Sequence, residues 1–449
     1  MLHIIAQLVR KNEASGRMNI CRETIKKIML RNPQKAVSNG YKLNAFAGII
    51  NACKSIILLV VVSRTNALHD AGILTISFAL ANLFVTIGNF GMRNYQVSDV
   101  KQTYSFPTYF SSRILTSLLM LFCVLGYLCF CIFVNGYTLE KAAVVLCIGV
   151  IFISESVENI FSGFYQQRGR LDVGSRLFFY RWLLIIILFS CILIFSKNLL
   201  LASFFAALMS MVCVLVFTKS TIRVFYQGHW YFDFSKILQL LKMCFPLFLS
   251  AFLSMYLAGA PKYAIDTYLT EEVQACYGFV SMPVFVTGLL ASFIYQPQLV
   301  ALSQDWAAGQ KQKFVHRVRG HFLIILGISI CCFVGAYVLG VPVLSTIYNI
   351  DLMPYKPVLL IIMIGSGFLA LNNYLSILLI IMRKQKVLLA GNGIVAALAL
   401  LFMGAAVQAH AALGASIYYL LLMVVLFILF FINTAISIGK AGIKENALA

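Results

Sequence analysis

The sequence is 449 residues long, with 61% hydrophobic and only 11% charged residues. Soluble domains average about 25% charged residues, so this composition excludes a water-soluble globular fold and predicts an all-α polytopic membrane protein. The formal net charge of +20 would suit a nucleic-acid partner, but the distribution of the charges along the chain argues against one.

Twelve apolar stretches are long enough to cross a bilayer, since about 20 residues of helix span its hydrocarbon core. We place them at residues 45–63, 71–91, 107–134, 139–161, 177–196, 199–218, 243–264, 273–300, 322–341, 357–382, 387–407 and 411–433. Six spans on each side of a central loop predict two six-helix lobes. The predicted parts are a basic cytoplasmic segment at 1–44, an N-lobe at 45–218, a cytoplasmic loop at 219–242, a C-lobe at 243–433 and a cytoplasmic tail at 434–449.

Lysine and arginine are shared unevenly among the loops. Of the 35 Lys and Arg residues, 27 fall in the two terminal segments and the even-numbered loops. The positive-inside rule therefore places both termini in the cytoplasm. The net charge is a topology signal and an attraction to anionic lipid, and no nucleic-acid partner is predicted. An early signal-peptide pattern is missing, so we expect no cleaved leader.

The first span carries Lys54 near its middle and Asn51 one turn before it. Lys54 lies about nine residues, or roughly 14 Å of helix, past the start of the span. A charge at this depth is a functional hypothesis by default, and we expect the ammonium to face a cavity or an anionic ligand. The alternative is that Lys54 pairs with a buried carboxylate and only stabilises packing.

Four further charges in spans three to five are candidates for a site. Arg113 lies about two turns into the third span, where it snorkels or pairs. Glu155 and Glu158 are three residues apart in the fourth span and share one helix face. They form either a proton or cation site or a salt bridge with Arg113 or Arg181, and their place near the inner end of the span favours the salt bridge. Arg181, one turn into the fifth span, is expected to snorkel.

The seventh span contains Lys262 toward its outer end, followed by Tyr263. Pro261 is expected to disturb the helix and so to turn Lys262 toward a cleft, although snorkelling is the alternative. In a weak parallel repeat of the two halves, Lys262 falls about one turn from the position equivalent to Lys54. We therefore expect both lysines to approach one shared ligand.

The positions of the tryptophans and the lengths of the loops agree with this predicted topology. Trp182, Trp230 and Trp306 fall at predicted inner boundaries, as an aromatic belt would. The outer loops are short, and the longest is predicted at 342–356.

Motifs for enzymatic chemistry are missing from the sequence. It contains no Walker P-loop, GxSxG or HExxH motif. The 12 cysteines show no CxxC pair and are interpreted as small buried hydrophobes. We predict no catalytic residues, no metal and no cofactor.

Five stretches in chain order resemble a known family. YKLNAFAGIINACKSI opens the first span, GMRNYQVSD closes the second and GFYQQRGRLD follows the fourth. APKYAIDTYL lies in the seventh span, and NNYLSILLIIMRKQK crosses the tenth. Over residues 41 to about 435 the chain resembles the Wzx-type polysaccharide-repeat-unit flippases of bacteria, in the MOP superfamily that also contains MATE exporters and the lipid II flippase.

The resemblance implies a V-shaped pair of lobes around a cleft in the bacterial cytoplasmic membrane. The implied substrate is an oligosaccharide on undecaprenyl pyrophosphate, moved from the inner to the outer leaflet by alternating access for capsule or O-antigen synthesis. Proton or sodium coupling, a monomeric state and partnership with a polysaccharide polymerase and chain-length proteins are expected. The candidate substrate-binding residues are Lys54, Lys262, Asn51, Tyr263 and Arg113, and the candidates for ion coupling or a lobe salt bridge are Glu155, Glu158 and Arg181.

The competing class is a cation-coupled exporter of the MATE type. An exporter of cationic molecules should favour carboxylates in its cavity, whereas the deepest charge in this sequence is Lys54. The sign of that charge favours an anionic substrate and hence the flippase.

Overall fold

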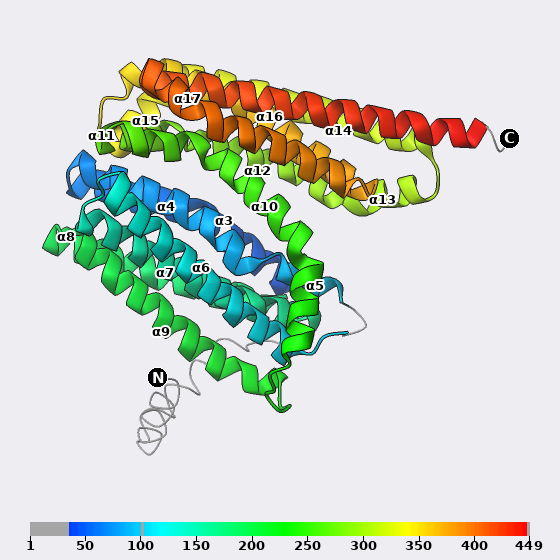
Figure 1. Ribbon diagram of the computed structural model, residues 1–449, viewed down its shortest axis with the longest axis horizontal. Helices are drawn as coiled ribbons and strands as arrows, with labels where there is room; N and C mark the ends of the chain where they lie inside the picture. Colours follow the sequence, from blue (N-terminus) through cyan, green and yellow to red (C-terminus); the bar gives the residue numbers. More distant parts are fainter. Residues whose placement is uncertain (1–35, 100–102, 447–449) are drawn as a thin grey trace. The chain divides into compact units, whose positions relative to one another are not determined.

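The computed structural model describes residues 36–99 and 103–446, and this part of the chain is helical, without β-strands (Figure 1). Within it, 11 helical segments are long and apolar enough to cross a bilayer. The last of them, α17 (Gln385–Asn446), is two helices joined at a kink, where His410 and Ala411 leave helical backbone angles. Each of the twelve predicted spans therefore has a helical counterpart, and the predicted all-α polytopic membrane fold is confirmed.

The described residues form two compact units. The first contains residues 36–58 and Phe84–Phe248, and the second contains Leu59–Leu83 and residues 249–446. This division assigns Leu59–Leu83 to the second unit, whereas the sequence places that segment in the N-lobe. The two six-helix lobes stay a prediction.

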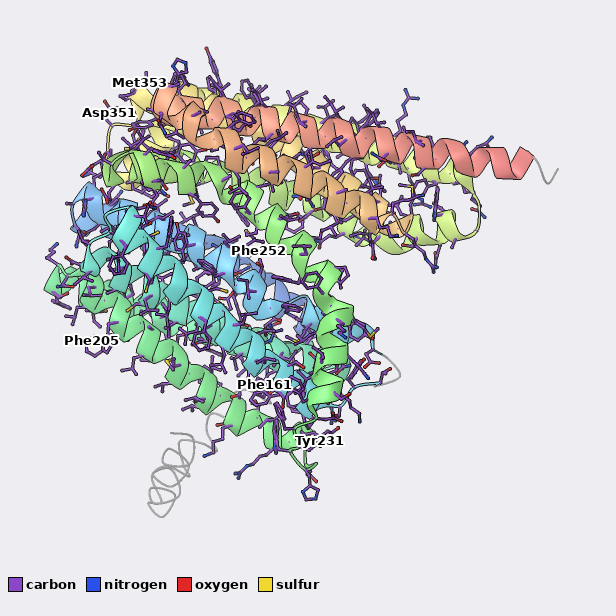
Figure 2. The ribbon with its side chains drawn as sticks, viewed as in Figure 1. Phe161, Phe205, Tyr231, Phe252, Asp351 and Met353 are labelled. Atoms are coloured by element: carbon purple, nitrogen blue, oxygen red, sulfur yellow. The ribbon has the colours of Figure 1, made fainter. Side chains whose placement is uncertain are left out.

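The first unit is a bundle centred on α7, which packs against α6, α8 and α9 (Figure 1). Its helices are the first part of α3 (Ala36–Thr65), the end of α4 (Leu68–Asn89), α5 (Met92–Ser98), α6 (Phe106–Val134), α7 (Leu139–Gln167), α8 (Leu171–Ser196), α9 (Leu199–Phe225) and the start of α10 (Phe234–Tyr268). Thr138 caps α7 by accepting the backbone N–H of Lys141 at 3.2 Å. Phe161, labelled in Figure 2, belongs to an aromatic core in which it contacts Phe106 and Phe110.

The second unit is centred on α16, which packs against α12, α14 and α17. Its further elements are α11 (Glu271–Val280), α12 (Pro283–Tyr295), a 3₁₀ turn (Gln296–Gln298), α13 (Leu299–Ala307), α14 (Lys311–Gly335), a π-helical turn (Ala336–Gly340), α15 (Val341–Tyr348), a 3₁₀ turn (Met353–Tyr355) and α16 (Lys356–Ile381). A Cβ atom at Gly72 would collide with the backbone of Glu271, and one at Gly278 with the side chain of Thr75. Glycine at these two positions is what allows the start of α4 to approach α11 closely.

Proline has different effects in the seventh and eighth spans. The expectation that Pro261 disturbs its helix is wrong, because α10 is helical throughout Phe234–Tyr268. Packing holds this region in place, since Pro261 is buried and the hydroxyl of Tyr263 donates to the carbonyl of Ala79 at 3.2 Å. The eighth span is instead broken just before Pro283, the first residue of α12, because proline has no N–H for the preceding helix.

Several helices extend beyond the predicted spans and shorten the loops. The predicted loop at 219–242 is reduced to residues 226–233, because α9 ends at Phe225 and α10 begins at Phe234. Helix α15 ends at Tyr348 and so occupies half of the predicted outer loop at 342–356. The predicted tail from residue 434 is helical as far as Asn446. Most of the predicted basic segment at 1–44 lies outside the described residues, and α3 begins at Ala36.

Candidate functional site

A cluster of charged side chains lies in the first unit, where α3, α7 and α8 meet. The Nζ atom of Lys54 lies 3.0 Å from Oε2 and 3.2 Å from Oε1 of Glu155. Arg181 donates from Nη2 to Oε2 of Glu155 at 3.3 Å and from Nε to Oε2 of Glu158 at 2.5 Å. The two carboxylates are therefore held by two cations from neighbouring helices.

The cluster is buried among aromatic rings. Lys54 is 5% exposed, Glu158 3% and Arg181 0%. The ammonium of Lys54 lies 4.3 Å from the ring centroid of Trp182, a distance typical of a cation–π contact. The indole N–H of Trp182 donates to Oε2 of Glu155 at 2.9 Å. Charges removed from water to this degree are tolerated only as a hydrogen-bonded set.

A polar cavity of about 240 Å³ borders the cluster. Its lining consists of Ala47, Gly48, Asn51, Arg93, Glu155, Glu158, Asn159, Ser162, Gly174, Ser175 and Phe178. Both glutamates of the cluster belong to this lining, whereas Lys54 and Arg181 do not. One oxygen of Glu158, Oε1, has no hydrogen-bond partner within the described residues.

The cation in the cavity wall is Arg93, which is not among the site residues predicted from the sequence. It is half-buried, and its Nη2 donates to Oε1 of Gln166 at 3.1 Å. Arg93 forms no ion pair with any carboxylate of the part of the chain that the structure describes. Burial lowers the pKa of Arg93, and the negative charge of Glu158 opposes that shift. The signal that could have identified it is its position in GMRNYQVSD, two residues after Gly91.

The short helix α5 positions Arg93. It begins after Gly91, whose φ of +66° is a conformation that favours glycine. At its other end Asp99 accepts the backbone N–H groups of Thr103 and Tyr104 at 2.9 and 3.1 Å and the hydroxyl of Tyr109 at 3.0 Å. Burial alone would raise the pKa of Asp99, but these hydrogen bonds outweigh it and hold the pKa below its usual value.

Four of the residues predicted from the sequence form salt bridges with one another at this site, and a fifth lines the cavity. Lys54, Glu155, Glu158 and Arg181 form the ion cluster, and Asn51 lines the cavity. The expectation that Arg181 snorkels is wrong, because its guanidinium is fully buried in the cluster.

The interpretation of Trp182 as part of an aromatic belt is also wrong, since its side chain is 0% exposed. The position of a residue along a span is readable from the sequence, but the direction in which its helix face points is not.

Arg113 does not pair with either glutamate, which corrects that prediction. It is 0% exposed and donates to the carbonyl of Gly88, with longer contacts to Asn89 and Ser156. Gly88 is in the last turn of α4, where carbonyl groups lack partners within the helix. Arg113 therefore acts as a cap of α4 and is not part of the cavity lining.

Lys262 and Tyr263 belong to the second unit. Tyr263 stacks on Tyr256 with ring centroids 5.9 Å apart. Lys262 is half-buried and makes no ion pair with the residues described. No group of His, Cys, Asp and Glu residues within the described ranges could hold a metal ion.

Comparisons with known proteins identify the fold. No model of a protein family matches the sequence. The chain is 24% identical over 346 residues to a capsular polysaccharide biosynthesis protein, CapF, of Staphylococcus aureus, covering 76% of this chain and 85% of the relative.

Solved structures of three transporters are similar to the chain. The first is an inward-facing multidrug-resistance MATE transporter of the MOP superfamily, with a TM-score of 0.71 at 11% identity, over 87% of this chain and 95% of that one. The second is the lipid II flippase MurJ in an inward closed conformation, with a TM-score of 0.65 at 15% identity, over 89% and 90%. The third is a MOP superfamily transporter of Pyrococcus furiosus, described as having a binding pocket of reversed polarity, with a TM-score of 0.55 at 12% identity, over 93% and 98%.

These likenesses define the class of protein. The chain is a multi-pass membrane protein with the fold of the MOP superfamily of transporters and flippases, and its neighbours are not enzymes. The resemblance inferred from the sequence is confirmed at the level of the fold.

Proposed function

We propose that this protein is a flippase that moves an undecaprenyl-pyrophosphate-linked oligosaccharide from the inner to the outer leaflet for the synthesis of a cell-surface polysaccharide. The fold is shared with the lipid II flippase, and the curated relative acts in capsular polysaccharide biosynthesis. The cycle is alternating access, with the polyprenyl tail remaining in the bilayer.

The observation that carries the proposal is the charge of the polar cavity. Arg93 lines the cavity together with Glu155 and Glu158. Lys54 and Arg181 lie behind the lining and pair with the two glutamates. These three cations and two carboxylates together carry one excess positive charge. A surplus cation in a low-dielectric wall attracts an anion and repels a cationic drug.

The size and the neutral lining of the cavity fit a polar head group. Its volume of about 240 Å³ is below the roughly 300–1,000 Å³ of pockets that enclose a drug-sized ligand. Asn51, Asn159 and Ser162 supply hydrogen-bond donors and acceptors for hydroxyl groups. The cavity thus suits a diphosphate or a sugar ring, not a whole oligosaccharide at once.

A MATE-type exporter is the second candidate, because Glu155 and Glu158 line the cavity. Each carboxylate is already paired with a cation, however, and a cationic substrate would have to compete with Lys54 or Arg181. The paired state of the glutamates favours the flippase.

Coupling to a proton or sodium gradient is part of the proposal. Glu158 is the candidate site, because it belongs to the cavity lining and its Oε1 has no hydrogen-bond partner among the described residues. We further propose a monomer in the bacterial cytoplasmic membrane, with both termini in the cytoplasm, that works beside a polysaccharide polymerase and chain-length proteins.

Complementation tests the proposal. The gene should restore surface polysaccharide to a bacterial strain that lacks its repeat-unit flippase and makes the matching lipid-linked oligosaccharide. Substitution of an exposed cation that is not part of the cavity lining, Arg223→Gln, should leave this restoration intact. Increased resistance of this strain to cationic dyes, without restored surface polysaccharide, would support the exporter and reject the flippase.

A further inference from the structure

We propose that Arg93 is the side chain that binds the diphosphate of the lipid-linked substrate, and that Lys54 acts indirectly by neutralising Glu155. This inference rests on the proposed function and assigns the anion-binding residue of its cavity. The proposed ligand contact is thus Arg93, on the short helix α5, and not Lys54, the deepest lysine of the sequence.

Arg93 is available for a ligand. Its guanidinium has five N–H donors, and the one hydrogen bond it makes within the described residues goes to Gln166. It lines the cavity and has no carboxylate partner at ion-pair distance there. The guanidinium binds phosphate oxygens in a bidentate manner, with charge-assisted hydrogen bonds.

Lys54, in contrast, is already engaged. Its ammonium contacts both oxygens of Glu155 and lies 4.6 Å from the ring centroid of Phe152 and 4.3 Å from that of Trp182. The lining of the cavity includes Glu155 but not Lys54. An anion would have to displace Glu155 to reach this lysine, and the longer contact with Arg181 would then be the one ion pair left to that carboxylate within the cluster.

The surroundings of Arg93 hold it in a fixed place. A Cβ atom at Gly163 would lie 3.2 Å from Cγ of Arg93 and would overlap Oε1 of Gln96, so the glycine in α7 is what leaves room for α5. Gln167 donates to the backbone carbonyl of Gln96 at 2.5 Å. The stretches GMRNYQVSD and GFYQQRGRLD are therefore packed together, and their contact preorganises the guanidinium at the cavity wall.

Ligand binding by the purified full-length protein in lipid nanodiscs tests the assignment. The probes are undecaprenyl pyrophosphate without sugars and uncharged undecaprenol. The wild type should bind the diphosphate at least tenfold more tightly. Arg93→Gln should weaken diphosphate binding by about tenfold to a hundredfold, the usual worth of hydrogen bonds to a charged group, and leave undecaprenol binding unchanged.

Two further variants keep this test decisive. Arg93→Lys retains the charge and should recover part of the affinity, and Arg223→Gln should bind like the wild type. If the wild type does not prefer the diphosphate, the proposed function is wrong. If the wild type prefers it and Arg93→Gln binds equally well, the function stands and the assignment of Arg93 is overturned.

The indirect role of Lys54 has its own test. Lys54→Gln removes the surplus positive charge and should weaken diphosphate binding. In the double variant Lys54→Gln with Glu155→Gln the surplus is restored, and affinity should return to within about threefold of the wild type, since the effects of a paired set are not additive. A lysine that contacts the ligand directly would give a double variant as weak as Lys54→Gln alone, and that result would reject the indirect role.

Discussion

At the scale of single residues, the four charges of the ion cluster balance only as a set. Glu155 holds both Lys54 and Arg181, and Arg181 also holds Glu158. Because the group is removed from water, loss of any member leaves one charge of the set without compensation. The energetic consequence is largest for Arg181, because it contacts both carboxylates and is fully buried.

Arg181→Gln should therefore destabilise the protein strongly. It leaves Glu158 buried without its cation, at a cost of about 3–5 kcal/mol. Thermal unfolding in detergent checks this, with Arg223→Gln as the control for loss of an exposed arginine. An unfolding temperature equal to that of the wild type would show that the pair contributes nothing to stability.

Glu158→Gln separates ion coupling from a structural role. If Glu158 carries the coupling proton, the variant should stay folded, lose gradient-driven transport and lose the pH dependence of substrate exchange. Transport measured across a range of pH on both sides of the membrane decides the matter. A variant that is merely less stable but keeps the wild-type pH profile would assign Glu158 to the salt bridge alone.

The ion cluster was partly predictable from the sequence. The depth of Lys54 in its span and the spacing of Glu155 and Glu158 identified three members of the cluster. Each of these two features can be read from a single helix. The burial of Arg181 and the contact of Trp182 with Glu155 depend on how α8 is rotated against α7. That rotation is set by packing between helices and cannot be read from either segment alone.

At the scale of elements, the break between α4 and α5 determines where Arg93 lies. Phe90 and Gly91 both have positive φ angles, +47° and +66°, and Phe90 stacks on Phe248 with ring centroids 4.4 Å apart. In the sequence, Gly88 and Gly91 indicate such a break. The sequence does not indicate that a seven-residue helix follows, because so short a helix is stabilised by its contacts with α7 and not by its own propensity.

Gly91→Ala should disturb this element. Alanine at a positive φ costs about 1–2 kcal/mol, and the added Cβ would also lie 3.0 Å from Cβ of Leu247. Gly136→Ala is a matched control, because Gly136 has a φ of +69° and open space around it. Thermal unfolding should show a larger loss for Gly91→Ala, and equal losses would mean that the contact with Leu247 is not restrictive.

At the scale of the whole molecule, the alternation of basic and neutral loops predicts the orientation in the membrane. Asp351 and Met353 lie in the connection between α15 and α16 (Figure 2), and Asp351 is exposed. Lys311, the first residue of α14, lies within the predicted inner loop between the eighth and ninth spans. The expectation that Lys54 and Lys262 share one ligand stays a prediction at this scale, since the two lysines belong to different units.

Cysteine labelling measures the orientation directly. In a variant without native cysteines, a membrane-impermeant maleimide added outside intact cells should label Asp351→Cys. It should label Lys311→Cys only after the membrane is permeabilised. The reverse pattern would place both termini outside and contradict the predicted topology.

The central claim is movement of a lipid-linked oligosaccharide across the bilayer, and a protection measurement in proteoliposomes tests it most directly. Undecaprenyl-pyrophosphate oligosaccharide is reconstituted in both leaflets, and an impermeant glycosidase is added outside. With the wild-type protein the protected fraction should fall from about one half toward zero, because the inner-leaflet lipid is carried outward. With Arg93→Gln this fall should be at least tenfold slower. Protection that stays at the level of protein-free liposomes, in vesicles shown to contain folded protein, would contradict the account.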